Sequence, residues 1–328
     1  MIPKRFTRKR KLRLPIDGLE EEPGPVVIAG GSGFLGRALA NSLLERRYDV
    51  VILSRHAAPD YGHFRTVVWD GRTVDDWGMV LDGASALVNL TGRSVACLDT
   101  PENRREIIES RVNSTRALLE ACSMCSEPPP VMVQASSLAI YGDSGDQVCD
   151  ESTPHGTGYS VEVCEQWEDA LFHDFLGPRR VALRIGFVIG RDGGALKPLA
   201  TLARSFLGGS AGSGRQFISW VDIDDFCGMV RWAMLTPDAE GAYNATGANP
   251  VTNAEFMKVL RRAVRRPWSP PVPEWAVKFG ARYIMHVDPK LILTGRRCMP
   301  KRLLDEGFLM KHTDLYLTLR QQLWVPQY

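Results

Sequence analysis

The stretch VVIAGGSGFLGRALANSLL, residues 26–44, decides the fold of this chain. Its first residues are small or apolar and predict a buried strand, whereas the segment from Phe34 onward has the spacing of an amphipathic helix. Gly30, Gly33 and Gly36 lie at the junction and form the pattern G-x-x-G-x-x-G. A strand, a glycine turn and a helix in this order are typical of a nucleotide-binding unit.

The glycine pattern predicts a pyrophosphate site. Gly30 allows a tight turn, Gly33 lets the backbone approach the anion, and Gly36 lets the helix lie close to the strand. The helix N-terminus adds free N–H donors and a partial positive charge. The alternative interpretation is a turn with a purely structural role. The residues expected to contact the nucleotide here are Gly30, Ser32, Gly33, Phe34, Leu35 and Gly36.

Short apolar runs continue to alternate with helical patterns as far as residue 190. This alternation predicts βαβ units and an α/β fold with a Rossmann-like, doubly wound parallel sheet. Thr100 and Pro101 have the residue types of an N-cap and a first helical position, so a helix is expected to begin there. The further strands are expected within residues 49–55, 66–70, 86–92, 128–137 and 179–190.

The pattern divides the chain into three predicted parts. Residues 1–24 hold seven Lys or Arg and four acidic residues, and we expect a basic, disordered tail. Residues 25–190 are the predicted nucleotide-binding domain. After residue 190 the regularity fades, so residues 191–328 are predicted to form a smaller C-terminal α/β cap lobe, with one return to the sheet near residues 217–235.

Composition limits the class of protein. Hydrophobic residues make up 44% of the chain and charged residues 24%, without an apolar run of membrane-spanning length. The basic tail is interpreted as a solvated leader or as a weak contact with a membrane or nucleic acid, while the absence of serine argues against a transit peptide. Without the tail the chain is almost neutral. We therefore expect a cytoplasmic protein without nucleic-acid or membrane partners.

Neither the cysteines nor the histidines have the spacing of a metal site. Cys122 and Cys125 form a CxxC pair, but no second pair of Cys or His lies at metal-ligand spacing. The seven cysteines are expected to be free thiols. Asp222, Asp224 and Asp225 are a possible metal cluster, but a structural role is preferred, and no metal is predicted.

The end of the second predicted strand selects the cofactor. Enzymes that use NAD usually place Asp or Glu there to accept hydrogen bonds from the ribose 2′-hydroxyl. This chain has Ser54 and Arg55 instead. A guanidinium group can bind a 2′-phosphate through two hydrogen bonds and stack on adenine. The sequence therefore predicts NADP(H), with a solvated strand-end arginine as the alternative.

Several ordered motifs resemble a known family. The chain is similar to the short-chain dehydrogenase/reductase superfamily of extended or atypical type. Within it, the chain resembles the NAD-dependent epimerase/dehydratase-like proteins that are often labelled SulA-like, including their C-terminal family domain. The matching motifs are GGSGFLG, VNLTG, EIIESRVNSTRALLEA, YGDSGD, EVCEQWE, RIGFVIGRDGGAL, GSGRQFISWVDIDD and MPKRLLDEGF.

The resemblance implies a Rossmann-type fold, NADP(H) as the cofactor and an undetermined substrate. It implies cofactor contacts from the glycine loop, and places Phe187 beside the nicotinamide. The further cofactor contacts that it implies are Ser54, Arg55, Leu90, Thr91, Glu106 and Arg111.

Catalysis in this superfamily uses a Tyr that gives or takes a proton, a Lys four residues later that lowers the pKa of the Tyr, and a Ser that holds the substrate oxygen. Ser137 and Tyr159 match the Ser and the Tyr. Val163 stands in place of the Lys, and residues 12–196 contain no lysine at all. We hypothesise that Arg111 supplies the missing charge and lowers the pKa of Tyr159. The alternatives are a rim tyrosine without a role for Tyr159 and a plain strand-end hydroxyl for Ser137.

Two functions are compatible with these residues. The first, which is preferred, is an NADP(H)-dependent oxidoreductase or epimerase that acts on a small polar substrate. The second is an NADP(H)-binding sensor or scaffold without turnover. Tyr141 is expected either to cover the nicotinamide or to pack, and Arg215 either to face an anionic substrate or to be solvated. A role as a cell-division inhibitor finds no support in the residues. The protein is expected to be a monomer or a homodimer.

Overall fold

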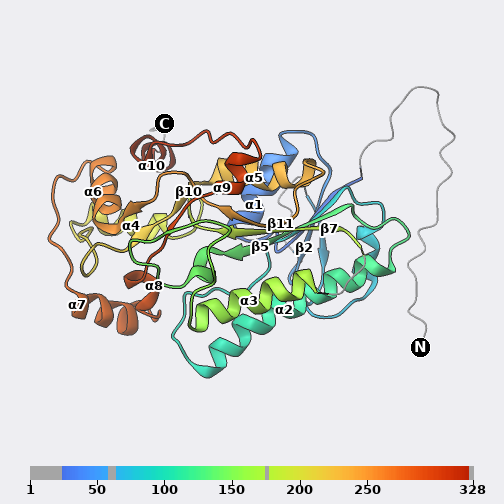
Figure 1. Ribbon diagram of the computed structural model, residues 1–328, viewed down its shortest axis with the longest axis horizontal. Coiled ribbons are helices and arrows are strands. Elements are labelled where there is room, and N and C mark those ends of the chain that lie inside the picture. The colour runs from blue at the N-terminus through green and yellow to red at the C-terminus, as the bar shows by residue number, and fades with distance from the viewer. Residues whose placement is uncertain (1–23, 58–63, 174–176, 325–328) are drawn as a thin grey trace.

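A parallel sheet organises the molecule (Figure 1). The computed structural model describes residues 24–57, 64–173 and 177–324, so the predicted basic tail lies outside the described residues except for Gly24. Within these ranges, seven strands form one sheet in the order β11-β7-β5-β4-β1-β2-β3, and every neighbouring pair is parallel. The strands are β1 (Val26–Ala29), β2 (Val50–Ser54), β3 (Arg65–Val68), β4 (Ala86–Asn89), β5 (Val131–Ser137), β7 (Arg179–Ile185) and β11 (Gly241–Ala245).

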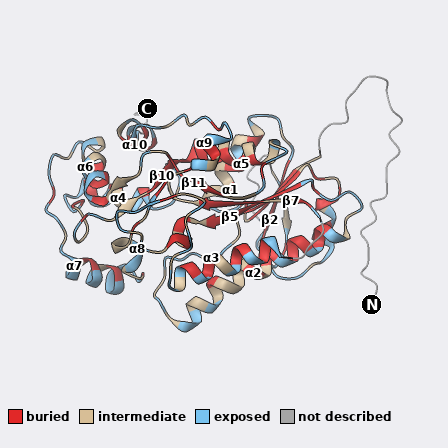
Figure 2. Cartoon of the chain, in the orientation of Figure 1, coloured by how far each residue is buried: buried red, intermediate tan, exposed pale blue. Residues whose placement is uncertain are grey.

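Helices cover both faces of this sheet, which confirms the predicted doubly wound α/β fold. Alternate residues of β1 show the two faces, because Val26 and Ile28 pack on one side and Val27 and Ala29 on the other. The helices α1 (Phe34–Leu44) and α5 (Ile223–Leu235) lie on the first side. The helices α2 (Pro101–Met124) and α3 (Tyr159–Phe172) lie on the second side, as Figure 2 shows by their buried faces toward the sheet.

The predicted start of α2 is confirmed. The side-chain oxygen of Thr100 accepts a hydrogen bond from the backbone N–H of Asn103, and Pro101 is the first helical residue. Three short helical turns accompany these elements: η1 (Asp76–Leu81), η2 (Leu138–Tyr141) and the π-helical η3 (Gly280–Ile284).

The strand expected within residues 179–190 is divided in two at Gly186. A Cβ atom at this position would lie 2.4 Å from the carbonyl oxygen of Ser219, so the chain passes close to another backbone segment. Beyond Gly186 the chain leaves the main sheet as β8 (Phe187–Ile189), which pairs with β10 (Trp220–Asp222). The apolar pattern alone does not reveal this change of sheet.

The strand that returns to the main sheet also differs from the prediction. We expected the return near residues 217–235, but this window forms β9 (Phe217–Ile218), β10 and α5. The return strand is β11, which pairs with β7. The helix α5 nevertheless covers the sheet, because its buried side chains are apolar and belong to the main core.

The C-terminal part packs around a cluster of its own. The buried side chains of Trp220, Phe256, Leu260 and Leu319 belong to this cluster. The remaining elements are β6 (Val148–Cys149), α4 (Leu196–Arg204), β12 (Val251–Thr252), α6 (Asn253–Ala263), α7 (Glu274–Phe279), α8 (Lys290–Leu293), β13 (Arg297–Cys298), α9 (Lys301–Asp305) and α10 (Leu315–Leu323). The division into domains at residue 190 stays a prediction.

The expectation of free thiols is confirmed. All seven cysteines lie in the described ranges and are free. In the part of the chain that the structure describes, every helix is too short or too polar to cross a membrane.

A buried carboxylate ties the C-terminal segment to the sheet. Asp225, on α5, is 2% exposed and accepts hydrogen bonds from the backbone N–H groups of Lys311 (3.0 Å) and His312 (2.8 Å). Its neighbour Asp222 caps α5 by accepting from the backbone N–H of Asp224, and also accepts from Gln322. The acidic cluster therefore has the structural contacts that were expected of it.

Replacing Asp225 with Ala is expected to destabilise the fold by about 3 kcal/mol, because two buried backbone N–H groups lose their acceptor. Chemical denaturation of the variant measures this loss. The exposed Asp224 provides the matched control, and Asp224→Ala should cost no more than about 1 kcal/mol. Equal effects of the two substitutions would contradict the anchoring role of Asp225.

Candidate functional site

The carboxyl ends of the central strands meet at one edge of the sheet. Because the strands are parallel, the glycine loop after β1 lies beside the residues that follow β2 and β4. In open α/β sheets this edge is where ligands bind. The candidate site is therefore built on these loops.

The glycine loop packs against the end of β4. Gly30 has a φ of +77°, and a Cβ atom there would lie 2.8 Å from the carbonyl oxygen of Leu90. A Cβ atom on Gly36 would lie 2.5 Å from the Cα atom of Gly31. Both positions therefore require glycine, as the spacing predicted. Leu90 and Thr91 form the other wall of the loop.

Gly33 differs from the other two glycines. A Cβ atom there would meet only the carbonyl oxygen of Gly30, at 3.4 Å, which is an ordinary contact. Gly33 is exposed and is the N-cap of α1. The helix has no side-chain cap and no acidic residue in its first turn. This N-terminus therefore presents its positive end to the site, where it can hold an anion.

A hydrogen bond joins the glycine loop to the end of β2. The hydroxyl of Ser54 donates to the hydroxyl oxygen of Ser32 at 3.2 Å. Ser54 is buried, whereas Arg55, the next residue, is exposed. The structure thus places the predicted cofactor-selecting residues next to the predicted pyrophosphate loop. Neither of the two residues at this strand end, Ser54 and Arg55, is acidic.

A buried polar network fixes the end of β4. The hydroxyl of Thr91 contacts Asn89 (2.5 Å) and Ser114 on α2 (2.6 Å). The amide of Asn89 donates in turn to Gln134 on β5 (3.0 Å) and Thr115 on α2 (3.3 Å). These hydrogen bonds therefore hold β4, β5 and α2 in fixed positions at the site. Asn89 and Gln134 interrupt apolar strands in the sequence, and this pattern could have indicated the network.

Glu106 and Arg111 make contacts within the protein. The carboxylate of Glu106 pairs with Arg93, which follows β4. Arg111 donates to the carbonyl oxygens of Arg93 and Ile107, both at 3.0 Å, and its guanidinium lies 4.9 Å from the ring centroid of Trp167. Burial lowers the pKa of Arg111. Its described contacts include no carboxylate ion pair.

Ser137 and Tyr159 lie at the ends of two neighbouring elements. Ser137 ends β5, and its hydroxyl accepts from the backbone N–H of Ala139 at 3.1 Å. Tyr159 begins α3, and its hydroxyl donates to the carbonyl oxygen of Arg104 at 3.1 Å. The guanidinium of Arg104 also lies 4.6 Å from the Tyr159 ring centroid. Val163 occupies the position of the usual lysine and is buried.

The pKa of Tyr159 is raised, contrary to the hypothesis. Burial is the largest cause, and the charges of Arg111 and Arg104 oppose it without reversing the direction. Arg111 therefore acts in the predicted sense, but its effect is smaller than the desolvation of the phenol. The hydroxyl of Tyr159 is a neutral hydrogen-bond donor in this environment.

A buried ion pair between β7 and α3 was not predicted from the sequence. Arg184 donates twice to Glu168, at 2.9 and 2.8 Å, and once to the hydroxyl oxygen of Tyr141, at 2.9 Å. Tyr141 donates to Asn244 on β11 at 2.8 Å, and burial raises its pKa to about 12. Tyr141 is therefore a packing residue and not a cover over the site. Burial of a charged residue inside a strand cannot be recognised from composition alone.

Phe187 and Phe34 mark where the site meets the C-terminal part. The ring centroid of Phe187 lies 5.4 Å from that of Phe256, within the C-terminal cluster. The ring of Phe34 packs on a glycine-rich loop, since Cβ atoms on Gly190 and Gly193 would lie 2.7 and 2.6 Å from it. Arg215 is a solvated loop residue, 80% exposed and 3.6 Å from Asp146.

Comparisons with known proteins assign the family. The model of the NAD dependent epimerase/dehydratase family matches residues 26–246. The chain belongs to this family. A domain of unknown function matches residues 272–322. The predicted resemblance to an epimerase/dehydratase-like subgroup of the short-chain dehydrogenase/reductase superfamily is thereby confirmed.

Relatives share almost the whole chain. The chloroplastic epimerase family protein SDR39U1 homolog of Arabidopsis thaliana is 30% identical over 327 residues, which are 98% of this chain and 93% of the relative. The epimerase family protein YfhF of Bacillus subtilis is 31% identical over 90% of this chain and 97% of its own length. The crystal structure of human SDR39U1 (isoform 2) with NADPH has a TM-score of 0.81 and 28% identity, covering 91% of this chain and 98% of the human chain.

The glycine loop offers a test of this geometry. Gly36→Ala is expected to destabilise the protein by about 2 kcal/mol, because its Cβ would overlap the backbone of Gly31. Gly33→Ala should cost no more than about 1 kcal/mol, because Gly33 has a φ of −76° and its Cβ would make only an ordinary contact, although Ala is a weaker N-cap than Gly. Thermal and chemical denaturation of both variants checks the difference. A loss of stability at Gly33 equal to that at Gly36 would be incompatible with this loop.

Proposed function

We propose that the protein binds NADP(H) at the glycine loop and transfers hydride between the nicotinamide and a small polar carbonyl compound or alcohol. The observation that carries the proposal is the open N-terminus of α1 beside Ser54 and Arg55, without a carboxylate at the end of β2. The similarity to human SDR39U1, whose crystal structure contains NADPH, supports the choice of cofactor.

The residues present fit a dinucleotide with a 2′-phosphate. The pyrophosphate would lie over Gly33, where no side chain obstructs the N-terminus of α1. The exposed guanidinium of Arg55 would bind the 2′-phosphate, and Leu90 and Thr91 would line the cofactor after β4. Phe187 is proposed to lie beside the nicotinamide, as the family resemblance implies. Glu106 and Arg111 would act through the loop after β4, because both are bonded to Arg93.

Ser137 and Tyr159 are proposed to handle the substrate oxygen. When bound, NADPH supplies the hydride. The hydroxyls of Ser137 and Tyr159 would donate hydrogen bonds to the oxygen that gains negative charge, and Tyr159 would give up its proton. For this the Tyr159 hydroxyl exchanges the Arg104 carbonyl for the substrate. Because the phenol is neutral and its pKa is raised, carbonyl reduction is favoured over alcohol oxidation, which needs a phenolate.

A sensor or scaffold that binds NADP(H) without turnover is the second candidate. Two observations favour it: Val163 replaces the usual lysine, and the Tyr159 hydroxyl is already bonded to a backbone carbonyl. Both candidates require the nucleotide site, and only the first requires consumption of NADPH.

We propose a cytoplasmic protein, monomeric or homodimeric, while one relative is described as chloroplastic.

Arg55 is expected to set the preference for NADPH over NADH. Arg55→Ala should weaken NADPH binding about tenfold to a hundredfold, through loss of a charge-assisted pair, and leave NADH binding almost unchanged. Parallel titrations that follow nicotinamide fluorescence measure both affinities. Arg65→Ala is the matched control, because Arg65 is exposed but pairs with Val51, at the opposite end of β2 from Ser54. Equal loss in both variants, or a wild-type protein that binds neither nucleotide, would contradict the proposal.

Tyr159→Phe is expected to lower NADPH-dependent reduction at least about a hundredfold without changing NADPH affinity. With the wild-type protein the reduction rate should stay constant across neutral pH and fall only above about pH 10, since the phenol must be protonated. A screen of small carbonyl compounds, followed at the nicotinamide absorbance band, supplies the assay. Tyr283→Phe, at an exposed site on the C-terminal part, is the control. Tight NADPH binding without oxidation by any of the carbonyl compounds would favour the sensor.

A further inference from the structure

An apolar stripe lies on the surface of the C-terminal part. It consists of Trp275, Phe279, Tyr283, Ile284 and Met285, on α7, η3 and the residue that follows them, and Trp275 and Ile284 are 73% and 72% exposed. The first three are spaced four residues apart and therefore share one helical face. Isolated exposed apolar residues are ordinary, but a contiguous set of this size marks an interaction surface.

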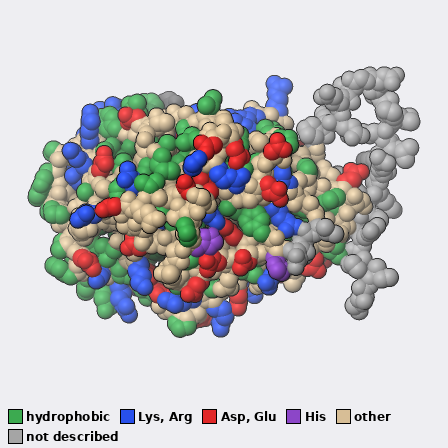
Figure 3. Space-filling view, in the orientation of Figure 1, with side chains coloured by type: hydrophobic (Ala, Val, Ile, Leu, Met, Phe, Trp, Pro, Cys, Tyr) green, Lys and Arg blue, Asp and Glu red, His purple; other side chains and the backbone are tan. Residues whose placement is uncertain are grey.

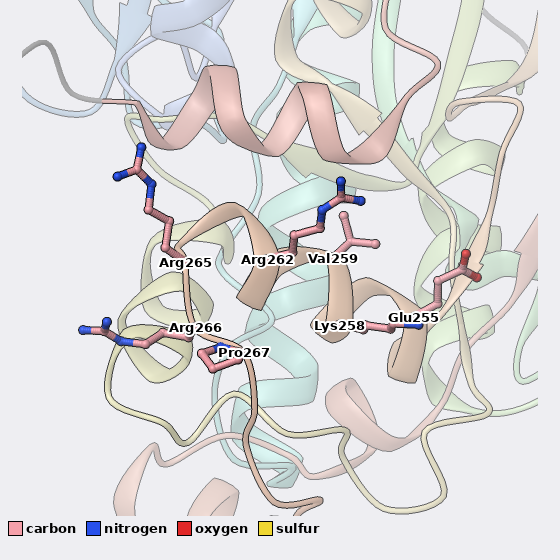
Figure 4. A pocket seen from close by; sticks show the side chains of 7 residues that line it. All are labelled: Glu255, Lys258, Val259, Arg262, Arg265, Arg266 and Pro267. Atoms are coloured by element: carbon pink, nitrogen blue, oxygen red, sulfur yellow. The ribbon is translucent and has the colours of Figure 1, made fainter.

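A basic groove lies on α6 and the turn after it (Figure 4), at the same end of the molecule as α7 (Figure 1). Its volume is about 590 Å³, and Lys258, Arg262, Arg265 and Arg266 line it. Figure 4 shows Arg265 and Arg266 extending from the end of the helix, with Glu255 near its other end. In the described part of the chain, no carboxylate forms an ion pair with any of these four cations.

Two of the four cations of the groove lie over aromatic rings. The guanidinium of Arg262 lies 4.2 Å from the ring centroid of Tyr316, and that of Arg266 lies 4.9 Å from the ring centroid of Phe206. These contacts keep the charges extended and leave them without a counter-ion. Phe206 is itself half exposed. The groove thus joins unpaired positive charge to exposed apolar surface.

The charge of this region differs from that of the rest of the chain. Residues 253–285 contain seven Lys or Arg and two Glu, a net charge of +5, whereas the whole chain has a net charge of +2. The remaining residues are therefore negative as a set. Figure 3 shows green and blue side chains interspersed at the left end of the molecule, over α6 and α7. Local positive charge of this kind attracts an anionic surface.

Three occupants can cover such a face, and the charge distinguishes them. A second copy of this chain on the same face would bring +5 against +5, which opposes pairing. An acidic protein would neutralise the cations, but it needs a concave surface to receive the protruding Trp275 and Ile284. An anionic bilayer meets both requirements, because its headgroups carry negative charge and its acyl boundary yields to protruding apolar side chains.

We propose that the basic groove and the apolar stripe dock the protein on the surface of an anionic lipid bilayer. The lipid phosphate groups would lie against Lys258, Arg262 and Arg265, while Trp275, Phe279 and Ile284 enter the headgroup region. None of the described helices spans the membrane in this arrangement. The inference is independent of the proposed function, and it differs from the expectation that the protein has no membrane partner.

Vesicle co-sedimentation of the full chain tests the proposal. Vesicles of phosphatidylcholine alone are compared with an equimolar mixture of phosphatidylcholine and phosphatidylglycerol. We expect binding to the anionic vesicles, weak binding to the neutral ones and release by high salt. Lys258→Gln and Arg265→Asn should each weaken binding about fivefold, and Trp275→Ser about tenfold. Asn is chosen at position 265 because Arg265 has a positive φ of 58°.

Matched controls are present elsewhere on the surface. Leu309→Ser removes an apolar side chain that is 83% exposed, and Arg105→Gln removes an exposed cation on α2. Neither should change vesicle binding. Circular dichroism and thermal denaturation of every variant confirm that each is folded. NADPH titration of the same variants is a separate readout, so failure of the proposed function does not affect this test.

Four outcomes would overturn the proposal. The first is failure of the wild-type protein to bind anionic vesicles, and the second is equal binding to both vesicle types. The third is binding that the variants retain in full, which would assign it to other residues. The fourth is a homodimer, seen by light scattering, that Trp275→Ser dissociates. Tight binding of polyglutamate without vesicle binding would instead assign the surface to an acidic protein.

Discussion

The parallel pairing of β1 with β2 and β4 is the constraint on which the rest of the structure depends. Since all three strands point the same way, their carboxyl ends meet at one edge, and the loops that follow them must share a small space. Gly30 meets this requirement by bringing its Cα atom against Leu90 without a side chain. The proposed nucleotide site is thus a consequence of strand direction together with the absence of a few Cβ atoms.

The sequence predicted what depends on local patterns. The strand, glycine turn and helix of residues 26–44 were recognised because each has a characteristic residue spacing, and Thr100 because an N-cap acts on the three residues after it. Burial on both faces of the sheet left continuous apolar runs, which are also visible in the sequence. The family motifs added the order of the remaining parts.

Long-range contacts were not predictable in the same way. The chain changes sheet at Gly186 because the carbonyl of Ser219, far along the chain, comes within contact distance. Likewise, the raised pKa of Tyr159 results from burial by elements remote in sequence, whereas the positions of Arg111 and Arg104 alone suggest a lowered one. Neither effect can be inferred from the local spacing of residues in the sequence. The ion pair between Arg184 and Glu168 was not predicted either, because it joins two different elements of the fold.

The main core also has a consequence for the order of folding. Leu303 and Phe308 pack in the same cluster as Val26 and Phe226, although they lie near the opposite end of the chain. The carboxylate of Asp225 likewise finds its partners only at residues 311 and 312. During synthesis, the N-terminal half therefore emerges with one side of its sheet incompletely covered. That side is completed only after residues 303–312 have left the ribosome, so the sheet becomes fully covered late in synthesis.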